Sequence, residues 1–304
     1  MKSIWSGIFK LVISSTLIFL ILWKVGIDRI SQTWQDLRHF EILAAFAISP
    51  IVAFLGAYKW KLMVQAVRLR PTWKEAMRSF LSGMGVGLLT PMRVGELSRI
   101  FFLRGNRDVL LGVALVDKAV DLQSLLILAV IGSALAFGPL TLSLFSGAVL
   151  AVFVLLLYPS PFISLFRWTV TYIPLMKKLE RMVAAIEAFP TKWLLFCLSI
   201  RFVVCLVDMV QFTLLINAFT PSSPTAILAS YPLIVLINTF PLTISGLGLR
   251  EGAAAVILSE FGVPAAAAVS ASFLLFTINT LIPGLLGALL MPQGTLAHIK
   301  KRLA

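Results

Sequence analysis

The sequence predicts an all-α protein that crosses a membrane several times. Of its 304 residues, 59% are hydrophobic and only 13% are charged, and the mean hydropathy is +0.98. A soluble domain carries about 25% charged residues, so this chain has too few polar groups to cover a surface in water. Several stretches approach the ~20 apolar residues that a spanning helix needs. The alternating pattern that is typical of a membrane β-barrel is not seen.

Six apolar stretches are predicted to span the membrane. They cover about residues 8–24, 42–58, 109–135, 142–158, 193–219 and 265–291. The first is interpreted as a retained span or signal anchor, because no small-residue cleavage site follows it. After it, Ile27, Ile30, Trp34 and Leu37 recur at helical spacing, which predicts an amphipathic helix at the membrane interface.

The formal charge of +13 is interpreted as a sign of membrane topology, and no nucleic-acid partner is expected. Basic residues gather in loops between the spans, as the positive-inside rule requires, and they suit an anionic cytoplasmic leaflet. We therefore expect a prokaryotic inner or plasma membrane protein with both termini in the cytoplasm. The strongest basic block follows the second span and consists of Lys59, Lys61, Arg68, Arg70, Lys74 and Arg78.

Two apolar regions are interrupted by proline, glycine and charge. The first interruption, "LLTPMRVGELSRIFFLRG", occupies residues 88–105 and the second, "NTFPLTISGLGLREGAAA", occupies residues 238–255. Basic residues flank the first on both sides, which predicts a re-entrant helical hairpin over about 76–105 that enters from the cytoplasm. The second predicts a hairpin over about 226–262 that enters from the outside. An ordinary pair of short spans is the alternative for each.

These elements divide the single transmembrane domain, 1–304, into two halves of opposite direction. Residues 1–136 form the first predicted repeat and residues 137–304 the second, each with two spans, a hairpin and a final span. Inverted repeats with paired, Gly/Pro-interrupted segments are typical of transporters whose binding site lies near the bilayer midplane. Irregular backbone is tolerated at that depth only where protein or a water-filled cavity covers it.

The two hairpin tips are therefore the predicted substrate site. Helix N-termini and arginines both favour an anionic group, and the acidic residues could hold the arginines or carry protons. The substrate-binding candidates are Arg93, Glu96, Arg99, Arg250 and Glu251. The residues expected to shape the hairpin backbone are Pro91, Gly95, Pro241, Gly246 and Gly248. The alternative is that each Arg and Glu merely pair at a loop end in the headgroup region.

Further charges lie inside the predicted spans, where they are costly and usually face a cavity or the bundle interior. Asp117, Lys118 and Asp121 lie in the third span, and Arg201 and Asp208 in the fifth. Lys118 and Asp121 are spaced to pair with each other. Arg201 and Asp208 lie about 10 Å apart along a helix, so they are expected to need other partners. We expect the five residues to line the pathway or lock its states; a purely structural network is the alternative.

Both interruptions resemble the signatures of a known family. "TPMRVGELSRIFFLR" resembles the "PGRxGELxRxxxLR" signature of the lysylphosphatidylglycerol synthase transmembrane region. "FPLTISGLGLREGAAAVIL", followed by "FGVPAAAAVSASFL", resembles that family's second signature, "P(x)nGGxGxREGxxxxLLxxxGVPxxxA". "VDKAVDL" is similar to its Glu-Arg-x-x-Asp element, with Asp117 and Lys118 as conservative departures. Ser245 departs from the Gly-Gly that is often found before the second tip.

The resemblance implies a flippase-like protein that moves lipids between membrane leaflets. In full-length relatives this region translocates aminoacylated phosphatidylglycerol and precedes a soluble aminoacyl-transferase domain. No such domain follows Ala304, so a stand-alone member without synthase activity is expected. Members of this kind are associated with several lipids, so the resemblance leaves open whether a phospholipid or a polyprenyl-linked lipid is moved.

Other function classes remain open at this stage. An integral-membrane enzyme acting on a lipid headgroup would have to use Glu96, Asp117 or Asp121. A small-solute or ion transporter would fit the same inverted repeat, as would an accessory subunit. The chain lacks a Walker-type phosphate loop, and Cys197 and Cys205 share one apolar segment without metal or disulfide spacing. We therefore expect no cofactor and no metal, an anionic lipid as the substrate, and a homo-oligomer as a possible assembly.

Overall fold

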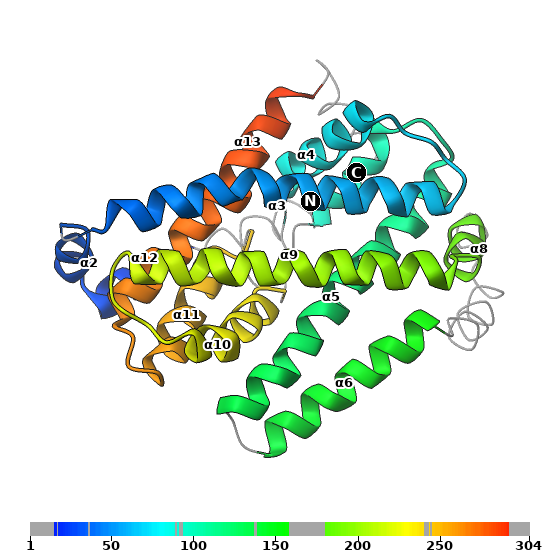
Figure 1. Cartoon of the computed structure of the whole chain (residues 1–304). Coiled ribbons are helices and arrows are strands. Elements are labelled where there is room, and N and C mark those ends of the chain that lie inside the picture. Colours follow the sequence, from blue (N-terminus) through cyan, green and yellow to red (C-terminus); the bar gives the residue numbers. More distant parts are fainter. Residues whose placement is uncertain are drawn as a thin grey trace.

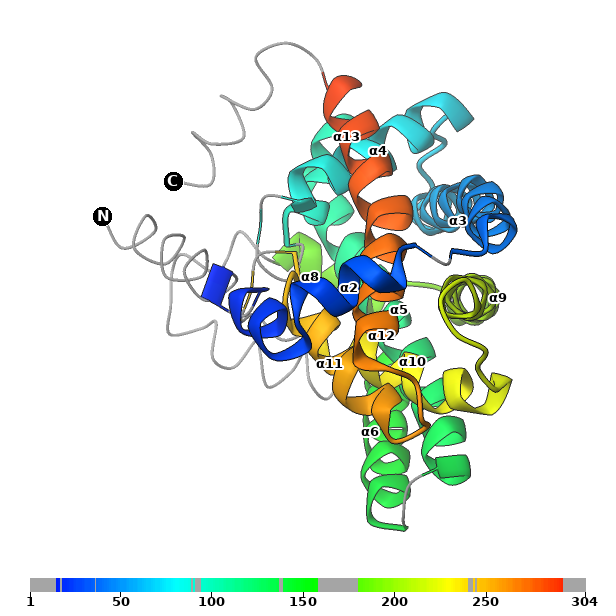
Figure 2. The ribbon, with the colours of Figure 1, turned by 90° about the vertical axis from the view of Figure 1, so that its left-hand side faces the viewer.

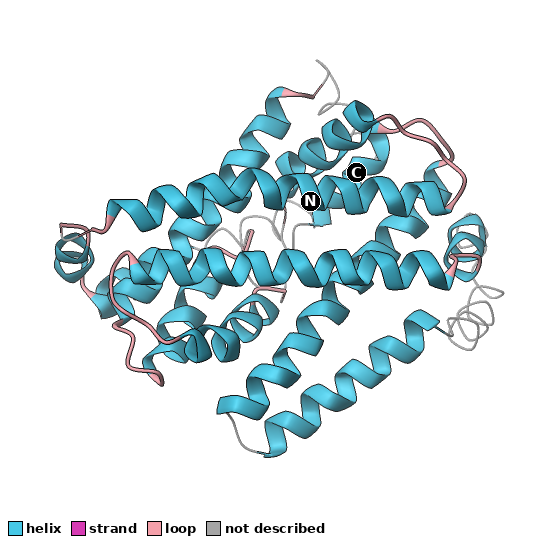
Figure 3. Cartoon of the chain, in the orientation of Figure 1, coloured by secondary structure: helices cyan, strands magenta, loops and turns pink. Residues whose placement is uncertain are grey.

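The structure is a computed structural model that describes most of the chain. The described residues are 15–16, 18–35, 37–88, 90, 94–136, 139–157, 180–239, 243 and 245–291. Every regular element in these ranges is a helix (Figure 3), which confirms the all-α prediction. Pro91, Arg93 and Pro241 lie outside the described residues, as do residues 158–179.

The helices follow one another in the order that the hydrophobic pattern predicts. Residues 18–25 form an N-terminal helical segment. The later elements are α2 (Ile27–Thr33), α3 (His39–Ala66), α4 (Trp73–Leu88), the 3₁₀-helix η1 (Val94–Phe102), α5 (Arg107–Ala136), α6 (Pro139–Leu157), α8 (Glu180–Glu187), α9 (Thr191–Asn217), α10 (Pro224–Ile237), α11 (Leu249–Ser259), α12 (Ala265–Phe276), the π-helix η3 (Thr277–Leu281) and α13 (Ile282–Leu289).

Three helices of the described residues are long and apolar enough to cross a membrane. They are α3, α9 and the continuous rod formed by α12, η3 and α13, and each matches a predicted span. α5 and α6, which are 30 and 19 residues long, occupy two further predicted spans. α3 continues to Ala66, well past the predicted end of its span at residue 58, and this extension moves a charged residue into the protein interior.

The long helices pack as antiparallel neighbours. α3 and α9 run side by side in opposite directions along one face, and α5 and α6 form a second antiparallel pair at an angle to them (Figures 1 and 2). One apolar core between α9, α10, α11 and α12 contains Phe212 and Leu258. A second core between α3, η1 and α5 contains Trp60 and Leu110. The two interrupted regions lie next to these cores.

α4 begins at a capping box. The backbone N–H of Thr72 donates to Glu75 Oε2 over 2.9 Å, and the N–H of Glu75 donates to Thr72 Oγ1 over 3.3 Å. Two of the free N–H groups at the helix start are satisfied in this way. The hydrogen bond from the backbone of Thr72, together with one that the Thr72 hydroxyl donates to Glu75 Oε2 over 3.0 Å, lowers the pKa of Glu75. The Thr-x-x-Glu motif thus starts the helix that leads into the first interruption.

Glycines bring α4 and α13 into backbone contact. A Cβ on Gly287 would lie 1.8 Å from the carbonyl oxygen of Leu81, and a Cβ on Gly85 would lie 2.8 Å from the backbone nitrogen of Ala288. Lipid tails are as apolar as leucine, so helices in a membrane associate through close packing rather than through the hydrophobic effect. The contact between these two helices therefore depends on the missing side chains.

We predict that Gly287→Ala destabilises the protein, because a methyl group there overlaps the Leu81 carbonyl. Overpacking typically costs about 1–3 kcal/mol, and the short distance favours the upper end of this range. Gly147→Ala is the matched control, since no atom lies within 4 Å of a Cβ there. Thermal unfolding in detergent, followed by tryptophan fluorescence, measures both. Equal melting temperatures for the two variants would contradict the packing argument.

Candidate functional site

The first break separates α4 from η1, and Thr90 joins the two sides. The backbone N–H of Gly95 donates to Thr90 Oγ1 over 2.7 Å, and this hydroxyl in turn donates to the carbonyl of Gly87 over 3.2 Å. A Cβ on Gly95 would lie 2.5 Å from the Val86 carbonyl oxygen. The glycine therefore allows η1 to turn back along α4, as the predicted hairpin requires.

η1 carries Arg99 into a buried ion-pair cluster. Asp117 of α5 lies between two cations: it pairs with the Arg99 guanidinium, and its Oδ1 lies 2.7 Å from Lys59 Nζ of α3. The guanidinium carbon of Arg99 also lies 3.9 Å from the ring centroid of Trp60. Ser79 of α4 donates to the Arg99 carbonyl over 2.8 Å and accepts from the Trp60 indole over 3.1 Å. α3, α4, η1 and α5 are thus tied together at one point.

A second carboxylate, Asp121, extends the cluster toward α9. It pairs with Lys59, and its Oδ1 lies 3.2 Å from Arg201 Nε. Lys118 lies 3.9 Å from the other oxygen of Asp121 and pairs directly with Glu96 of η1. Glu96 is therefore held by a lysine of α5, and the acid of the first break is connected to the charges of the third predicted span.

Arg201 also reaches Asp208 within its own helix. Its Nη1 lies 3.9 Å from Asp208 Oδ2, so the two residues contact each other in addition to the other partners that were expected, Asp121 for Arg201 and Asn279 for Asp208. The estimate of about 10 Å between them was the rise of the helix over seven residues. It left out the length of the arginine side chain, which covers much of that distance. Asn279 of η3 donates to Asp208 over 3.2 Å and to Gln211 over 2.6 Å.

These residues form a charge network with equal numbers of cations and carboxylates. The cations are Lys59, Arg99, Lys118 and Arg201, and the carboxylates are Glu96, Asp117, Asp121 and Asp208. One end is dry, since the side chain of Asp117 is 2% exposed. The other end is accessible, since the side chain of Lys118 is 38% exposed and that of Asp121 is 25% exposed. A substrate group that approaches the network from the protein surface would contact Lys118 and Asp121 first.

Lys59 is the member of the network that sequence reasoning missed. It was assigned to the cytoplasmic basic block after the second span, which is wrong: it lies inside α3 with 4% exposure. The aromatic neighbours Tyr58 and Trp60, and the apolar residues that continue to Ala66, are the signal that could have placed it in the helix. Its partners could not be found without the fold.

The second break separates α10 from α11 and is a left-handed turn. Ser245, Gly246 and Gly248 have φ angles of 52°, 79° and 83°. A side chain at Gly246 would overlap Asn238 of α10, since its Cβ would lie 1.5 Å from Asn238 Oδ1. A residue with a Cβ is disfavoured at positive φ, so Ser245 occupies a position that suits glycine. This explains why Gly-Gly fits the same turn.

The charges at the second break satisfy each other. The Gly248 N–H donates to Glu251 Oε2 over 2.8 Å at the start of α11. Arg250 pairs with the other oxygen of Glu251, donates to Ser272 Oγ over 3.0 Å and lies over the ring of Phe276. Arg250 is only 6% exposed. In this conformation it holds α11 against α12, and the anion at the helix start is the protein's own Glu251.

Some neutral polar atoms near the second break have no partner among the described residues. Asn238 Oδ1, Thr243 Oγ1 and Ser245 Oγ are buried and make no hydrogen bond within the part of the chain that the structure describes. A buried polar group without a partner is costly and calls for an explanation such as a bound water or ligand. The two hydroxyls and the amide oxygen would form hydrogen bonds with a polar headgroup that reached them.

One side of the last predicted span connects the two breaks. Ser272, Phe276 and Asn279 follow at spacings of four and three, which places them along one side of the helix. The first two contact Arg250, and the third contacts Asp208. Asn279 lies in the π-helix η3, and single π turns inside α-helices occur frequently at functional sites. Ser49 of α3 donates to the Ile278 carbonyl there over 2.9 Å.

The sequence profile of the lysylphosphatidylglycerol synthase TM region matches residues 7–287. The match covers both breaks and every member of the charge network. The chain belongs to the lysylphosphatidylglycerol synthase transmembrane-region family. It is therefore an integral membrane protein. No curated protein matches the chain.

Membership in the lysylphosphatidylglycerol synthase transmembrane-region family confirms the resemblance seen in the sequence. The "GEL" and "REG" elements of its signatures contain Glu96 of the charge network and the Arg250–Glu251 pair. Cys197 and Cys205, which were expected to be packing residues, are buried free thiols of α9. Arg93, the first of the three arginines in the first signature, lies outside the described residues, and its role stays a prediction from the sequence.

We predict that Asp117→Asn is strongly destabilising, because it leaves Lys59 and Arg99 buried without their shared anion. Removing one partner of a buried ion pair costs about 3–5 kcal/mol. Adding Lys59→Met to this variant should recover part of the loss by removing one uncompensated charge. Lys118→Gln, at the accessible end, should change the melting temperature little. A double variant that is no more stable than Asp117→Asn alone would contradict direct pairing of Lys59 with Asp117.

Proposed function

We propose that this protein moves a phosphate-bearing lipid between membrane leaflets, with the headgroup passing between the two breaks. The observation that carries the proposal is the charge network, which is buried in a membrane protein yet accessible at Lys118 and Asp121. Ionisable groups at membrane depth are costly and mark substrate or ion pathways. A lipid is the substrate that best fits the family. The lipid moved is a phospholipid or a polyprenyl-linked lipid.

The packing of the helices supports an inverted repeat of residues 1–136 and 137–304. Each hairpin packs its second arm on the last helix of its own half: η1 lies on α5, and α11 lies on α12. Each first arm packs on the last helix of the other half: α4 lies on α13, and α10 lies on α5. α3 and α9, the corresponding spans, pack on each other. Exchanging the halves preserves this pattern of contacts.

The distribution of charge supports a topology with cytoplasmic termini. Arg68, Arg70, Lys74 and Arg78 surround the connection between α3 and α4, and such a cluster favours the cytoplasm. The first hairpin would then enter from the cytoplasmic side and the second from the outside. The membrane would be the inner or plasma membrane of a prokaryote.

Headgroup binding would proceed by exchange of ion-pair partners. The phosphate of a lipid that reaches the accessible end replaces Glu96 or Asp121 on Lys118 and Arg201. The network is neutral beforehand, so a headgroup with net negative charge adds an unbalanced charge in a medium of low dielectric constant. A proton taken up by Glu96 or Asp121 would cancel it. At the second break, the hydroxyls of Thr243 and Ser245, which have no hydrogen-bond partner among the described residues, would bind the polar groups of the headgroup.

We propose transport rather than catalysis because the embedded carboxylates are all held by cations. Glu96 pairs with Lys118, Asp117 with Lys59 and Arg99, and Glu251 with Arg250. A general base must be within reach of the proton that it removes. A carboxylate that is fully paired suits partner exchange better than proton abstraction from a substrate.

We predict that Lys118→Gln slows lipid transfer in liposomes by roughly 10–100-fold, since a hydrogen bond to a charged group contributes about 1.5–3 kcal/mol. The liposomes carry fluorescent phosphatidylglycerol or a polyprenyl-phosphate sugar, and reduction or enzymatic capture reports the outer leaflet. Arg70→Gln, an exposed cation away from the network, is the control and should transfer normally.

Transfer that is unchanged in both Lys118→Gln and Arg93→Ala would refute a site at the first break. Product formation from the labelled lipid by the purified protein alone would instead favour an enzyme. Uptake of a soluble solute into sealed vesicles, without lipid transfer, would favour a solute transporter. The three readouts can be taken from one preparation.

We predict opposite accessibility for the two hairpins. With Cys197 and Cys205 replaced by alanine, Val94→Cys should react with an impermeant maleimide added from the cytoplasmic side, and Ser259→Cys with reagent added from the outside. Val94 is 53% exposed and Ser259 is also exposed, so both thiols are reachable. Labelling of Val94→Cys from the outside would indicate a pair of ordinary short spans in place of a re-entrant hairpin.

A further inference from the structure

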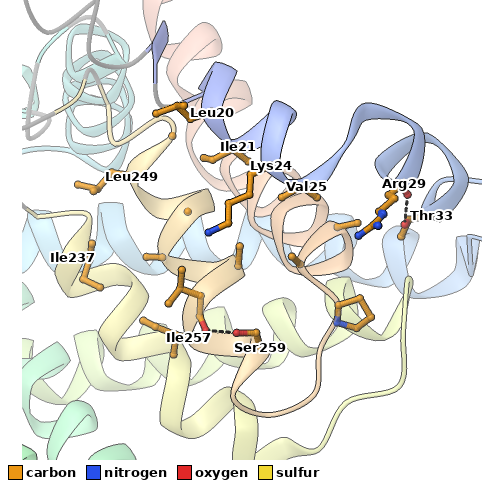
Figure 4. A pocket seen from close by; sticks show the side chains of 18 of the residues that line it. Leu20, Ile21, Lys24, Val25, Arg29, Thr33, Ile237, Leu249, Ile257 and Ser259 are labelled. Carbon is orange, nitrogen blue, oxygen red and sulfur yellow. Dashed lines mark hydrogen bonds between the residues drawn. The ribbon is translucent and has the colours of Figure 1, made fainter.

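A cleft of about 900 Å³ lies on the flank of the protein, away from the charge network. We call it the lateral cleft. Its walls are the N-terminal helical segment with α2 on one side, and α11 with the start of α12 on the other (Figure 4). The volume falls within the ~300–1,000 Å³ typical of ligand pockets. Most of the lining is aliphatic, and the polar lining is concentrated in a few side chains.

Two cations face this cleft and have no carboxylate partner in the described part of the chain. Lys24 extends across it toward α11, and Arg29 lies farther along, at the end where Thr33 is found (Figure 4). Neither cation forms an ion pair with a residue that the structure describes. In the charge network, by contrast, each cation has a carboxylate within 4.0 Å. Within the described residues, therefore, no carboxylate pairs with the positive charge of the cleft.

The lining is polarised along the length of the cleft. Leu20 and Leu249 lie at the end opposite Arg29 (Figure 4), and Ile21, Val256 and Ile257 contribute further aliphatic surface. The stem of a lysine packs well on apolar surface while its ammonium group binds an anion. An occupant that matches both ends has a hydrocarbon tail and a negatively charged headgroup.

A glycine keeps one wall of the cleft open. Gly252 lies inside α11, where a glycine costs about 1 kcal/mol relative to alanine. A Cβ at this position would meet only Ile21 Cδ1, at an ordinary contact distance of 3.6 Å. Packing between helices therefore does not require glycine here, unlike Gly85 or Gly287 on the opposite side. A close approach by a molecule in the cleft would explain it.

The cleft leads toward the second break. A smaller cavity of about 380 Å³ shares Ile21 and Gly248 with it and reaches Glu251 and Ser270. Trp34, which directly follows α2, lines this cavity, donates to Ser270 Oγ over 3.0 Å and fixes α2 against α12. The smaller cavity thus lies between α2 and α12 and adjoins the start of α11.

We propose that the lateral cleft binds a membrane lipid with an anionic phosphate headgroup, held by Lys24 and Arg29, with its acyl chains along Leu20 and α11. This goes beyond the proposed function, because the site is separate from the charge network and binding there needs no transfer. Under the proposed topology the first predicted span runs from the cytoplasm to the outside, so Lys24 at its end would lie in the outer leaflet. Only this leaflet assignment rests on the proposed function.

Native mass spectrometry of the purified full chain tests this directly. The protein is titrated with phosphatidylglycerol, with phosphatidylcholine of the same acyl chains, and with inorganic phosphate. The wild type should retain phosphatidylglycerol preferentially, and phosphate alone should not compete with it. A cation near a lipid surface contributes about fivefold in binding, so Lys24→Gln with Arg29→Gln should weaken phosphatidylglycerol binding by roughly 20-fold.

Two further variants separate the cleft from general charge effects. Arg70→Gln with Lys192→Gln removes the same charge from exposed positions elsewhere and should leave binding unchanged. Gly252→Phe should block the cleft and reduce the binding of both lipids; its melting temperature, measured alongside, shows whether it folds. If Gly252→Phe does not fold, the comparison between the cleft double variant and the control double variant tests the proposal without it.

Specific outcomes would overturn the proposal. The first is that the wild type binds phosphatidylglycerol and phosphatidylcholine equally. The second is that the two double glutamine variants lose the same amount of binding. The third is that inorganic phosphate competes for the site as effectively as lipid does. A dimer of the wild type that Gly252→Phe abolishes would identify a second copy of the chain as the occupant. The assay measures no transfer, so a failed transfer experiment and a failed binding experiment are distinct results.

Discussion

The burial of Asp117 between Lys59 and Arg99 is the constraint on which the rest of the structure depends. A carboxylate whose side chain is 2% exposed is stable only when cations and hydrogen bonds compensate for its lost hydration. Those cations come from α3 and from η1, so the first break must return along α4 to deliver Arg99. Asp121 and Lys59 then extend the same network to Arg201 of α9, and four separate elements are placed relative to one another by charge.

The irregular backbone of the protein is arranged around this network. Thr90 and Gly95 close the first break, and a left-handed turn at Ser245 and Gly246 closes the second. At the π-helix η3, Ser49 compensates one displaced carbonyl. Backbone groups that lack water must find partners inside the protein, and here side chains of neighbouring helices supply them. Glycines at the α4–α13 contact allow the backbones themselves to approach.

The two candidate binding regions differ in their electrostatics. The charge network is neutral and mostly paired, so it suits a headgroup that exchanges partners and moves on. The lateral cleft has two cations that pair with no described carboxylate and a long aliphatic wall, so it suits a lipid that resides there. The smaller cavity that joins the cleft to Glu251 places this resident lipid next to the second break. A lipid could thus be held beside the hairpin through which a headgroup is proposed to pass.

The sequence by itself determined the helical class, the order of the helices and the two breaks, because hydrophobic runs and Gly/Pro interruptions are local properties of the chain. The signatures around Glu96 and Arg250 likewise identified the family. Partner choice could not be predicted from the sequence: Lys59 was assigned to the cytoplasmic basic block, and Arg250 was expected to bind the substrate at the second tip, with pairing to Glu251 as the alternative. Only the tertiary structure decided that Lys59 joins Asp117 and that Arg250 holds Glu251 and Ser272. An ion pair depends on distances between helices that are remote in sequence, and these distances are set by packing.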